Sequence, residues 1–341
     1  MLLAPIIDAR EWTRRLSAQR AANAWRIWSS YQRAKRSKEP VIKGFPINIS
    51  IEPTTACNLR CPECPSGLRA FTRPTGNLKQ PLFERVINEL ADDLFSLTFY
   101  FQGEPYINPS FLDMVQHASG RSIYTATSTN AHFLTEEAAE RTVRSGLSRL
   151  IISLDGTDQG TYEAYRKEGT LSKVIEGAER IVRWKRLLKS RTPHVVFQFL
   201  VVKPNEHQIP AARALAKRIG VDDLWLKTAQ VYDPHENHPL IPTQDKYARY
   251  RRAADGTWQL KNAMHDHCWK MWHSCVITWD GRVVPCCFDK DAHHVLGDLS
   301  KQTFKEVWNG DAYRDFRGAL LQSRSNLEMC RNCSEGSPVW A

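Results

Sequence analysis

Apolar and polar positions along residues 46–230 alternate between two periods. Short apolar runs rich in β-branched and aromatic residues predict strands, and the stretches between them, with apolar residues at helical spacing, predict helices. The predicted strands cover residues 47–54, 96–103, 122–129, 149–156, 195–203 and 224–229. Because these strands alternate with helices along the chain, we expect them to be parallel and joined by helical crossovers.

Six strand–helix units predict an α/β fold, namely a partial (β/α)6 barrel of the TIM type, and a doubly wound open sheet is the alternative. In both architectures, functional residues gather beyond the carboxyl ends of the strands. Polar segments end the second, third and fourth predicted strands, at 102–105, 129–130 and 153–156. A loop with three cysteines follows the first strand, so all four segments are expected to share one rim.

The loop after the first strand, CNLRCPEC, holds Cys57, Cys61 and Cys64. Three thiolates bind three irons of a four-iron cluster and leave the fourth iron open to an exchangeable ligand. Pro62 and Pro65 bias the loop toward extended conformations that fit around such a cluster. A structural zinc site is the alternative, but it needs a fourth ligand, and no histidine lies near this loop in the sequence.

A second group of cysteines lies near the C-terminus. Its members are Cys268, Cys275, Cys286, Cys287, Cys330 and Cys333. The segment CVITWDGRVVPC predicts a hairpin with a two-residue turn at Asp280–Gly281, which would place Cys275 opposite Cys286. Two clusters bound only by thiolates need eight cysteines, so these six indicate one cluster with two spare thiols. A structural zinc knuckle is the alternative here.

The nine cysteines fall in short-spaced groups, which is typical of metal ligands and not of disulfides, and a reducing cytoplasm is the expected compartment. No run of eighteen apolar residues predicts a membrane-spanning helix. The net charge is +10, and residues 1–44 hold ten Lys or Arg against three acidic residues, a net of +7. This basic arm contains tryptophans and is predicted to be helical. It would either pack on the main domain or lie on an anionic membrane surface.

The segments CNLRCPEC and FQGEP resemble the Cys-x3-Cys-x2-Cys and Gly-Gly-Glu-Pro motifs of the radical S-adenosylmethionine superfamily, with Gln102 in place of the first glycine. The position before Cys64 is often aromatic in that family and is Glu63 here. The resemblance implies that the cluster binds S-adenosylmethionine through its amino and carboxylate groups. Reductive cleavage then yields a 5′-deoxyadenosyl radical, which abstracts a hydrogen atom from a substrate. Cys57, Cys61 and Cys64 are the catalytic residues on this reading.

The same resemblance implies further contacts with the cofactor. The expected cofactor-binding residues are Gly103 and Glu104 at the amino group, Asn130 and Ser153 at the ribose, and Asp155 and Arg166, with Arg166 at the carboxylate. Simpler roles stand beside the last four. Asn130 would be a turn residue, Ser153 and Asp155 helix caps, and Arg166 a surface charge.

The spacing Cys268-x12-Gly281-x4-Cys286, followed by Cys330-x2-Cys333, resembles the SPASM/Twitch extension of these enzymes. It implies a second [4Fe-4S] cluster with Cys268, Cys286, Cys330 and Cys333 as its ligands, and Cys275 is the alternative to Cys268. Only eight residues follow Cys333, which implies a shortened form with one auxiliary cluster. The expected domains are the basic helical arm 1–45, the barrel 46–230, a linker 231–262 and the auxiliary-cluster domain 263–341.

The sequence therefore predicts a radical S-adenosylmethionine enzyme with two [4Fe-4S] clusters that oxidises or otherwise modifies a peptide, protein or sugar-type small molecule. The expected partners are a reductant such as flavodoxin or ferredoxin and a membrane surface beside the arm, with no nucleic acid. The alternative is a zinc-binding, cysteine-rich protein that binds nucleic acid through the arm, with affinity that falls steeply as salt rises. A non-catalytic relative is a third possibility, against which the complete three-cysteine loop argues.

Overall fold

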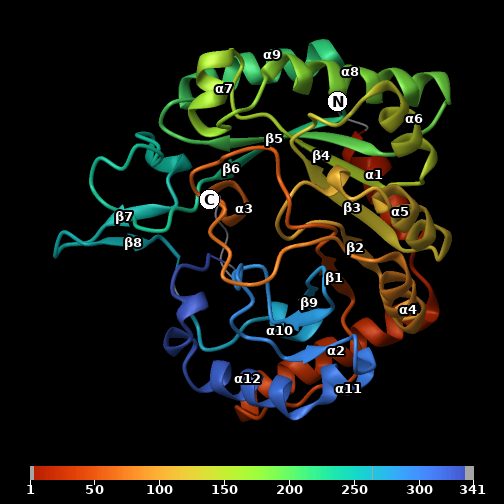
Figure 1. Ribbon diagram of the computed structural model, residues 1–341. Helices are drawn as coiled ribbons and strands as arrows, with labels where there is room; N and C mark the ends of the chain where they lie inside the picture. Colours follow the sequence, from red (N-terminus) through yellow and green to blue (C-terminus); the bar gives the residue numbers. More distant parts are fainter. Residues whose placement is uncertain (1–3, 263, 335–341) are drawn as a thin grey trace.

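A nine-stranded sheet forms the centre of the computed structural model, which describes residues 4–262 and 264–334. The strand order is β11-β10-β9-β1-β2-β3-β4-β5-β6 (Figure 1). The first six strands are β1 (Asn48–Ile51), β2 (Ser96–Thr98), β3 (Tyr124–Thr129), β4 (Arg149–Ser153), β5 (His194–Val201) and β6 (Asp223–Thr228). These six strands are parallel and adjacent in chain order, which confirms the predicted α/β fold and all six predicted strands.

Helices between the strands cover the outer face of the sheet (Figure 1). They are α4 (Gln80–Leu90), α5 (Phe111–Gly120), α6 (Glu136–Arg144), α7 (Gln159–Tyr165), α8 (Leu171–Leu187) and α9 (Ile209–Ile219). The short helix α3 (Pro65–Leu68) lies instead near the centre of the molecule, and the connections also contain the 3-10 turns η1 (Pro105–Ile107) and η2 (Glu206–Gln208) (Figure 1). Alternate strand residues such as Phe197 and Phe199 are fully buried in the core that these helices complete. Each such side chain contributes about 1.5–3 kcal/mol by leaving water.

The C-terminal strands extend this sheet instead of forming a separate one. They are β9 (Ser274–Ile277), β10 (Arg282–Val284) and β11 (Gly297–Asp298), and they lie among α10 (Lys270–His273), α11 (Phe304–Asn309), α12 (Asp311–Gln322), η4 (Arg324–Asn326) and η5 (Glu328–Cys330). Strand β9 pairs with β1 in parallel, so the C-terminal region is hydrogen-bonded directly to the first strand of the barrel. The position of the second cysteine group is thereby fixed relative to the first strand of the barrel.

The register of the β9–β10 hairpin differs by one residue from the prediction. Val283 pairs with Ile277, and the amide of Thr278 donates to the carbonyl of Arg282, so three residues form the turn. Gly281 makes this turn possible, because it adopts a φ of +91° that glycine reaches without strain. A shift of one residue reverses the face on which a side chain lies. The expected pairing of Cys275 with Cys286 is therefore wrong.

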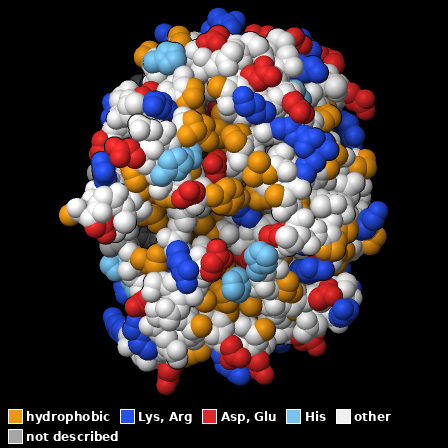
Figure 2. All heavy atoms as spheres, turned by 60° about the vertical axis from the view of Figure 1, so that its left-hand side comes forward, with side chains coloured by type: hydrophobic (Ala, Val, Ile, Leu, Met, Phe, Trp, Pro, Cys, Tyr) orange, Lys and Arg blue, Asp and Glu red, His pale blue; other side chains and the backbone are white. Residues whose placement is uncertain are grey.

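Residues 231–262, expected to form a linker, contain the 3-10 turn η3 (Asp245–Tyr247) and an antiparallel hairpin of β7 (Tyr250–Arg252) and β8 (Trp258–Leu260). Val231, Leu240 and Tyr250 pack in one buried cluster with Leu59 and Cys61. The segment therefore packs against the three-cysteine loop. On the face that carries β7 and β8, hydrophobic side chains gather toward the centre, with charged and histidine side chains around them (Figure 2).

The basic arm forms α1 (Ala4–Thr13) and α2 (Ala18–Ser37), and it packs on the barrel. Asp8 accepts a hydrogen bond from the Tyr124 hydroxyl at 2.5 Å and pairs with Arg149. Because Tyr124 and Arg149 are the first residues of β3 and β4, α1 lies at the amino ends of these strands, opposite the rim. No helix within the described residues is long and apolar enough to cross a membrane.

Arg20 anchors α2, and its replacement by alanine should lower the free energy of unfolding by about 2–3 kcal/mol. Its buried guanidinium donates to the carbonyls of Arg15, Ala91, Arg121 and Ser122 at 2.5–3.0 Å. Urea denaturation under anaerobic conditions measures the effect. The control is Arg14→Ala, whose side chain is 57% exposed and pairs with Glu11, and it should cost less than about 1 kcal/mol. Equal costs for the two variants would contradict an anchoring role for Arg20.

Candidate active site

The three-cysteine loop crosses the carboxyl end of β1 and closes against Gly103, just beyond β2. Gly103 has a φ of +76°, and a Cβ atom there would lie 2.2 Å from the carbonyl oxygen of Thr54. Its amide donates to the Ser66 hydroxyl at 2.9 Å. Glycine is therefore required at this position both by the backbone conformation and by the close approach of the loop.

Each thiol of the loop contacts a different neighbouring group. Leu59 donates its amide to the sulfur of Cys57 at 3.4 Å, and Arg166 donates Nη1 to the sulfur of Cys61 at 3.7 Å. The sulfur of Cys64 lies 3.8 Å from the side-chain oxygen of Gln102. Gln102, which stands where the motif has a glycine, is therefore a contact of the loop.

All three thiols line one cavity of about 220 Å³. The predicted cofactor-binding residues that line the same cavity are Gly103, Glu104, Asn130, Ser153 and Arg166. The shared rim predicted from the strand ends is thus present in the structure. Asp155 is the one predicted residue that is absent from the lining, and it is completely buried behind the cavity.

Asp155 holds Arg166 in place. Its Oδ2 accepts from Nε of Arg166 at 2.5 Å, and its Oδ1 accepts from the amide of Leu200 at 2.8 Å. The Arg166 side chain is only 17% exposed, so it is no surface charge. Neither Asp155 nor Ser153 caps the following helix, because Asp158 is the N-cap of α7.

Glu104 places a buried carboxylate at the cavity. It accepts hydrogen bonds from the Thr129 hydroxyl at 2.8 Å and from the amide of Asn130 at 2.7 Å. Burial outweighs these bonds and raises the pKa of Glu104 to about 7. Asn130 also forms a local turn with His132, and its side-chain amide donates to Asn58 of the loop at 2.7 Å.

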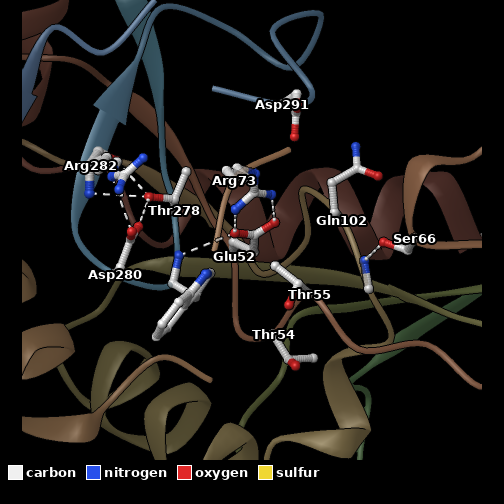
Figure 3. A network of polar contacts seen from close by, with 12 residues as sticks. Glu52, Thr54, Thr55, Ser66, Arg73, Gln102, Thr278, Asp280, Arg282 and Asp291 are labelled. Atoms are coloured by element: carbon white, nitrogen blue, oxygen red, sulfur yellow. Dashed lines mark hydrogen bonds and ion pairs between the residues drawn. The ribbon is translucent and has the colours of Figure 1, made fainter. Parts of the chain in front are cut away.

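A buried ion pair that the sequence analysis missed lies beside this rim (Figure 3). Arg73 donates two hydrogen bonds to Glu52, at 2.6 and 2.8 Å, and both side chains are almost completely buried. The amide of Trp279 donates to the same carboxylate at 3.2 Å. Glu52 therefore joins the segment after the cysteine loop to the turn between β9 and β10. Its only signal in the sequence is an acidic residue directly after an apolar strand.

A second, much smaller cavity of about 10 Å³ lies in the C-terminal region. The four cysteines of the predicted ligand set line it, namely Cys268, Cys286, Cys330 and Cys333. Cys275 and Cys287 do not line it. Cys275 is buried elsewhere beside Tyr313, and Cys287 accepts from the ammonium of Lys270 at 3.4 Å. Within residues 4–262 and 264–334, no three His, Cys, Asp or Glu side chains converge as a single-ion site, and each cysteine group surrounds a space instead.

Comparison with known proteins identifies both regions. The family model of the radical SAM superfamily matches residues 51–199, and the SPASM iron–sulfur cluster-binding domain matches residues 268–334. The chain belongs to the radical S-adenosylmethionine superfamily. Its C-terminal part is a SPASM domain, and these two domains imply S-adenosylmethionine, the [4Fe-4S] cluster that binds it, and auxiliary iron–sulfur binding. The zinc alternative is thereby replaced by iron–sulfur chemistry.

Relatives match this chain along most of their length. The PqqA peptide cyclase of Gluconobacter oxydans is 24% identical, over 86% of this chain and 84% of its own. The tungsten-containing aldehyde ferredoxin oxidoreductase cofactor-modifying protein of Pyrococcus furiosus is 23% identical, over 84% and 86%. The structure of Streptococcus suis SuiB bound to S-adenosylmethionine has the same fold, with a TM-score of 0.63, 16% identity, and coverage of 91% of this chain and 76% of its own.

Replacement of Gly103 by alanine should disrupt the three-cysteine loop. The added Cβ would meet backbone at 2.2 Å in a conformation that alanine avoids, so the iron bound after reconstitution should fall by about half, as for loss of one of two clusters. Iron and sulfide analysis of the purified variant measures this. Gly120→Ala is the matched control, because a Cβ there meets nothing within 4 Å. Full iron content in Gly103→Ala would contradict the assigned close approach.

Proposed function

We propose that this radical S-adenosylmethionine enzyme holds its cofactor-binding cluster with Cys57, Cys61 and Cys64. The convergence of these three thiols with the ends of three further strands on one cavity carries the proposal. When bound, the cluster and cofactor supply a 5′-deoxyadenosyl radical that removes a hydrogen atom from the substrate. The chain's own residues bind and orient the cofactor and keep water from the cavity.

Three side chains have proposed roles toward the cofactor. Glu104 accepts from its amino group, since an ammonium offsets the burial of the carboxylate. Arg166, held by Asp155, offers positive charge beside Cys61 and the cofactor carboxylate. Asp155 thus acts as a positioning residue and does not touch the cofactor itself. Asn130 and Ser153 are the proposed contacts of the ribose.

For the second site we propose an auxiliary [4Fe-4S] cluster held by Cys268, Cys286, Cys330 and Cys333. Full ligation by four thiolates favours electron transfer over direct binding of the substrate. The substrate is proposed to be a peptide or a small molecule, because the relatives named above act on a peptide or modify a cofactor. A flavodoxin or ferredoxin is the proposed reductant.

Anaerobic reconstitution with iron and sulfide tests both cluster assignments. The wild-type protein should bind about eight irons per chain and form 5′-deoxyadenosine when dithionite and S-adenosylmethionine are added. Alanine at Cys57, Cys61 and Cys64 together should leave about four irons and no 5′-deoxyadenosine. The controls Cys275→Ala and Cys287→Ala should keep all the iron. Zinc-loaded protein without 5′-deoxyadenosine formation, or iron loss in either control, would overturn the assignments.

We further propose that the outward face of α2 rests on an anionic membrane surface. Trp25 and Trp28 are 64% and 45% exposed, with ring centroids 5.1 Å apart, on the side of α2 away from the buried Ile27. Exposed Lys35 and Arg36 follow within three turns of the helix. Exposed tryptophans beside basic residues are typical of helices that lie in the headgroup region of a bilayer.

Co-sedimentation with lipid vesicles tests this contact. The wild-type protein should bind vesicles that contain phosphatidylglycerol at low salt, and binding should weaken as salt rises. The double variant Trp25→Ala, Trp28→Ala should lose about tenfold in affinity, because it removes the exposed apolar area. Leu187→Ala, a change at an exposed position on α8 (62%), should bind as the wild type does. Equal binding of the double variant and the wild type would contradict the contact.

A further inference from the structure

A cavity outside the two cysteine sites has a volume of about 480 Å³. Pro65 and Leu68, which follow Cys64 in the chain, line one side of it. Phe288 and Met329 line the other side, and both also line the cavity of the four C-terminal cysteines. The cavity therefore shares two wall residues with the C-terminal cysteine site and is separated from the three-cysteine site by the short helix α3.

Lys290 brings a cation to this cavity. Its ammonium lies 3.3 Å from the hydroxyl of Tyr232 and 4.6 Å from the centroid of the same ring. Among the described residues, no carboxylate forms an ion pair with Lys290. The nearby carboxylate of Glu63 attracts Lys290 without contacting it, and it accepts from the amide of Tyr232 at 3.0 Å and lies 3.9 Å from His238.

Two of the three acidic residues of the cavity wall, Asp289 and Asp291, accept hydrogen bonds from neighbouring groups. Asp289 accepts from the amides of His293 and His294, at 2.8 Å each. Asp291 accepts from the amide of Thr72 at 3.0 Å and from its hydroxyl. Glu328 lies exposed on the wall. Lys290 is thus a half-buried cation of this cavity that contacts the hydroxyl and ring of Tyr232 but forms no close ion pair with a carboxylate of the described residues.

We infer that Lys290 binds an anionic group, a carboxylate or a phosphate, of the substrate of this enzyme. A half-buried ammonium is stabilised by an anion that also hydrogen-bonds to it, and Tyr232 is positioned to donate to the same anion. Leu68, Phe288 and Met329 offer apolar contact to the remainder of that molecule. The inference rests on the proposed function, because it takes this cavity as part of the substrate site between the two clusters.

Calorimetric titration of the reconstituted protein with inorganic phosphate, and separately with acetate, at low chloride tests the inference. One anion should bind per chain, and Lys290→Gln should weaken binding about tenfold to hundredfold, as expected for loss of a charge-assisted hydrogen bond. Lys290→Arg should retain binding, which shows that the fold survives substitution. Lys301→Gln, a change at a side chain that is 79% exposed, should bind as the wild type does.

The two anions distinguish the two sources of negative charge. Preference for phosphate assigns a phosphorylated substrate, and preference for acetate assigns a carboxylate. Binding that is equal in the wild type and in Lys290→Gln, or that is undetectable for both anions, would overturn the inference. Formation of 5′-deoxyadenosine in the absence of substrate is measured on the same samples. If it occurs while anion binding fails, the inference is wrong and the proposed function stands.

Discussion

The carboxylate of Glu52 is the point on which the geometry of both cysteine sites depends. It lies at the end of β1, fully buried, and binds Arg73 and the amide of Trp279 at once. A buried pair of this kind is stable only while both charges stay satisfied, and loss of one partner costs about 3–5 kcal/mol. Because β9 also pairs with β1, a single strand sets the positions of the cysteine loop and of the C-terminal hairpin. The distance between the two sites is therefore built into the sheet.

The charged groups at the rim of the barrel, Glu104 and Asp155 with its partner Arg166, are largely buried. Glu104 has a pKa near 7 because burial opposes its charge more than its hydrogen bonds favour it. One carboxylate oxygen of Asp155 accepts from Arg166 and the other accepts from the amide of Leu200, so the guanidinium is held in one orientation. A buried carboxylate and a guanidinium that is paired with Asp155 thus line one cavity, as the proposed contacts with the amino and carboxylate groups of S-adenosylmethionine require.

The sequence pattern predicted the six parallel strands and the shared rim. The periodicity of apolar residues marks each strand and helix, and the alternation of strands with helices along the chain indicates parallel strands. The hairpin register could not be predicted in this way, because it depends on whether Trp279 joins Asp280 and Gly281 in the turn. The burial of Asp155 and the partnership of Glu52 with Arg73 join residues that are far apart in the chain, and no local pattern encodes them. The ligand set of the second site shows both cases. The motif resemblance put forward Cys268, which lines the cavity, and the assumed register put forward Cys275, which does not.

The basic arm is also packed against both halves of the molecule. Its first helix contacts the starts of β3 and β4, and its second helix brings the hydroxyl of Tyr31 within 2.9 Å of His267, the residue before Cys268. The arm therefore spans the molecule from the amino end of the barrel to the C-terminal cysteine site. The buried face of its second helix packs on the fold, and Trp25 and Trp28 remain 64% and 45% exposed on the outward face. The proposed membrane contact would cover this exposed apolar area, which the fold itself leaves in water.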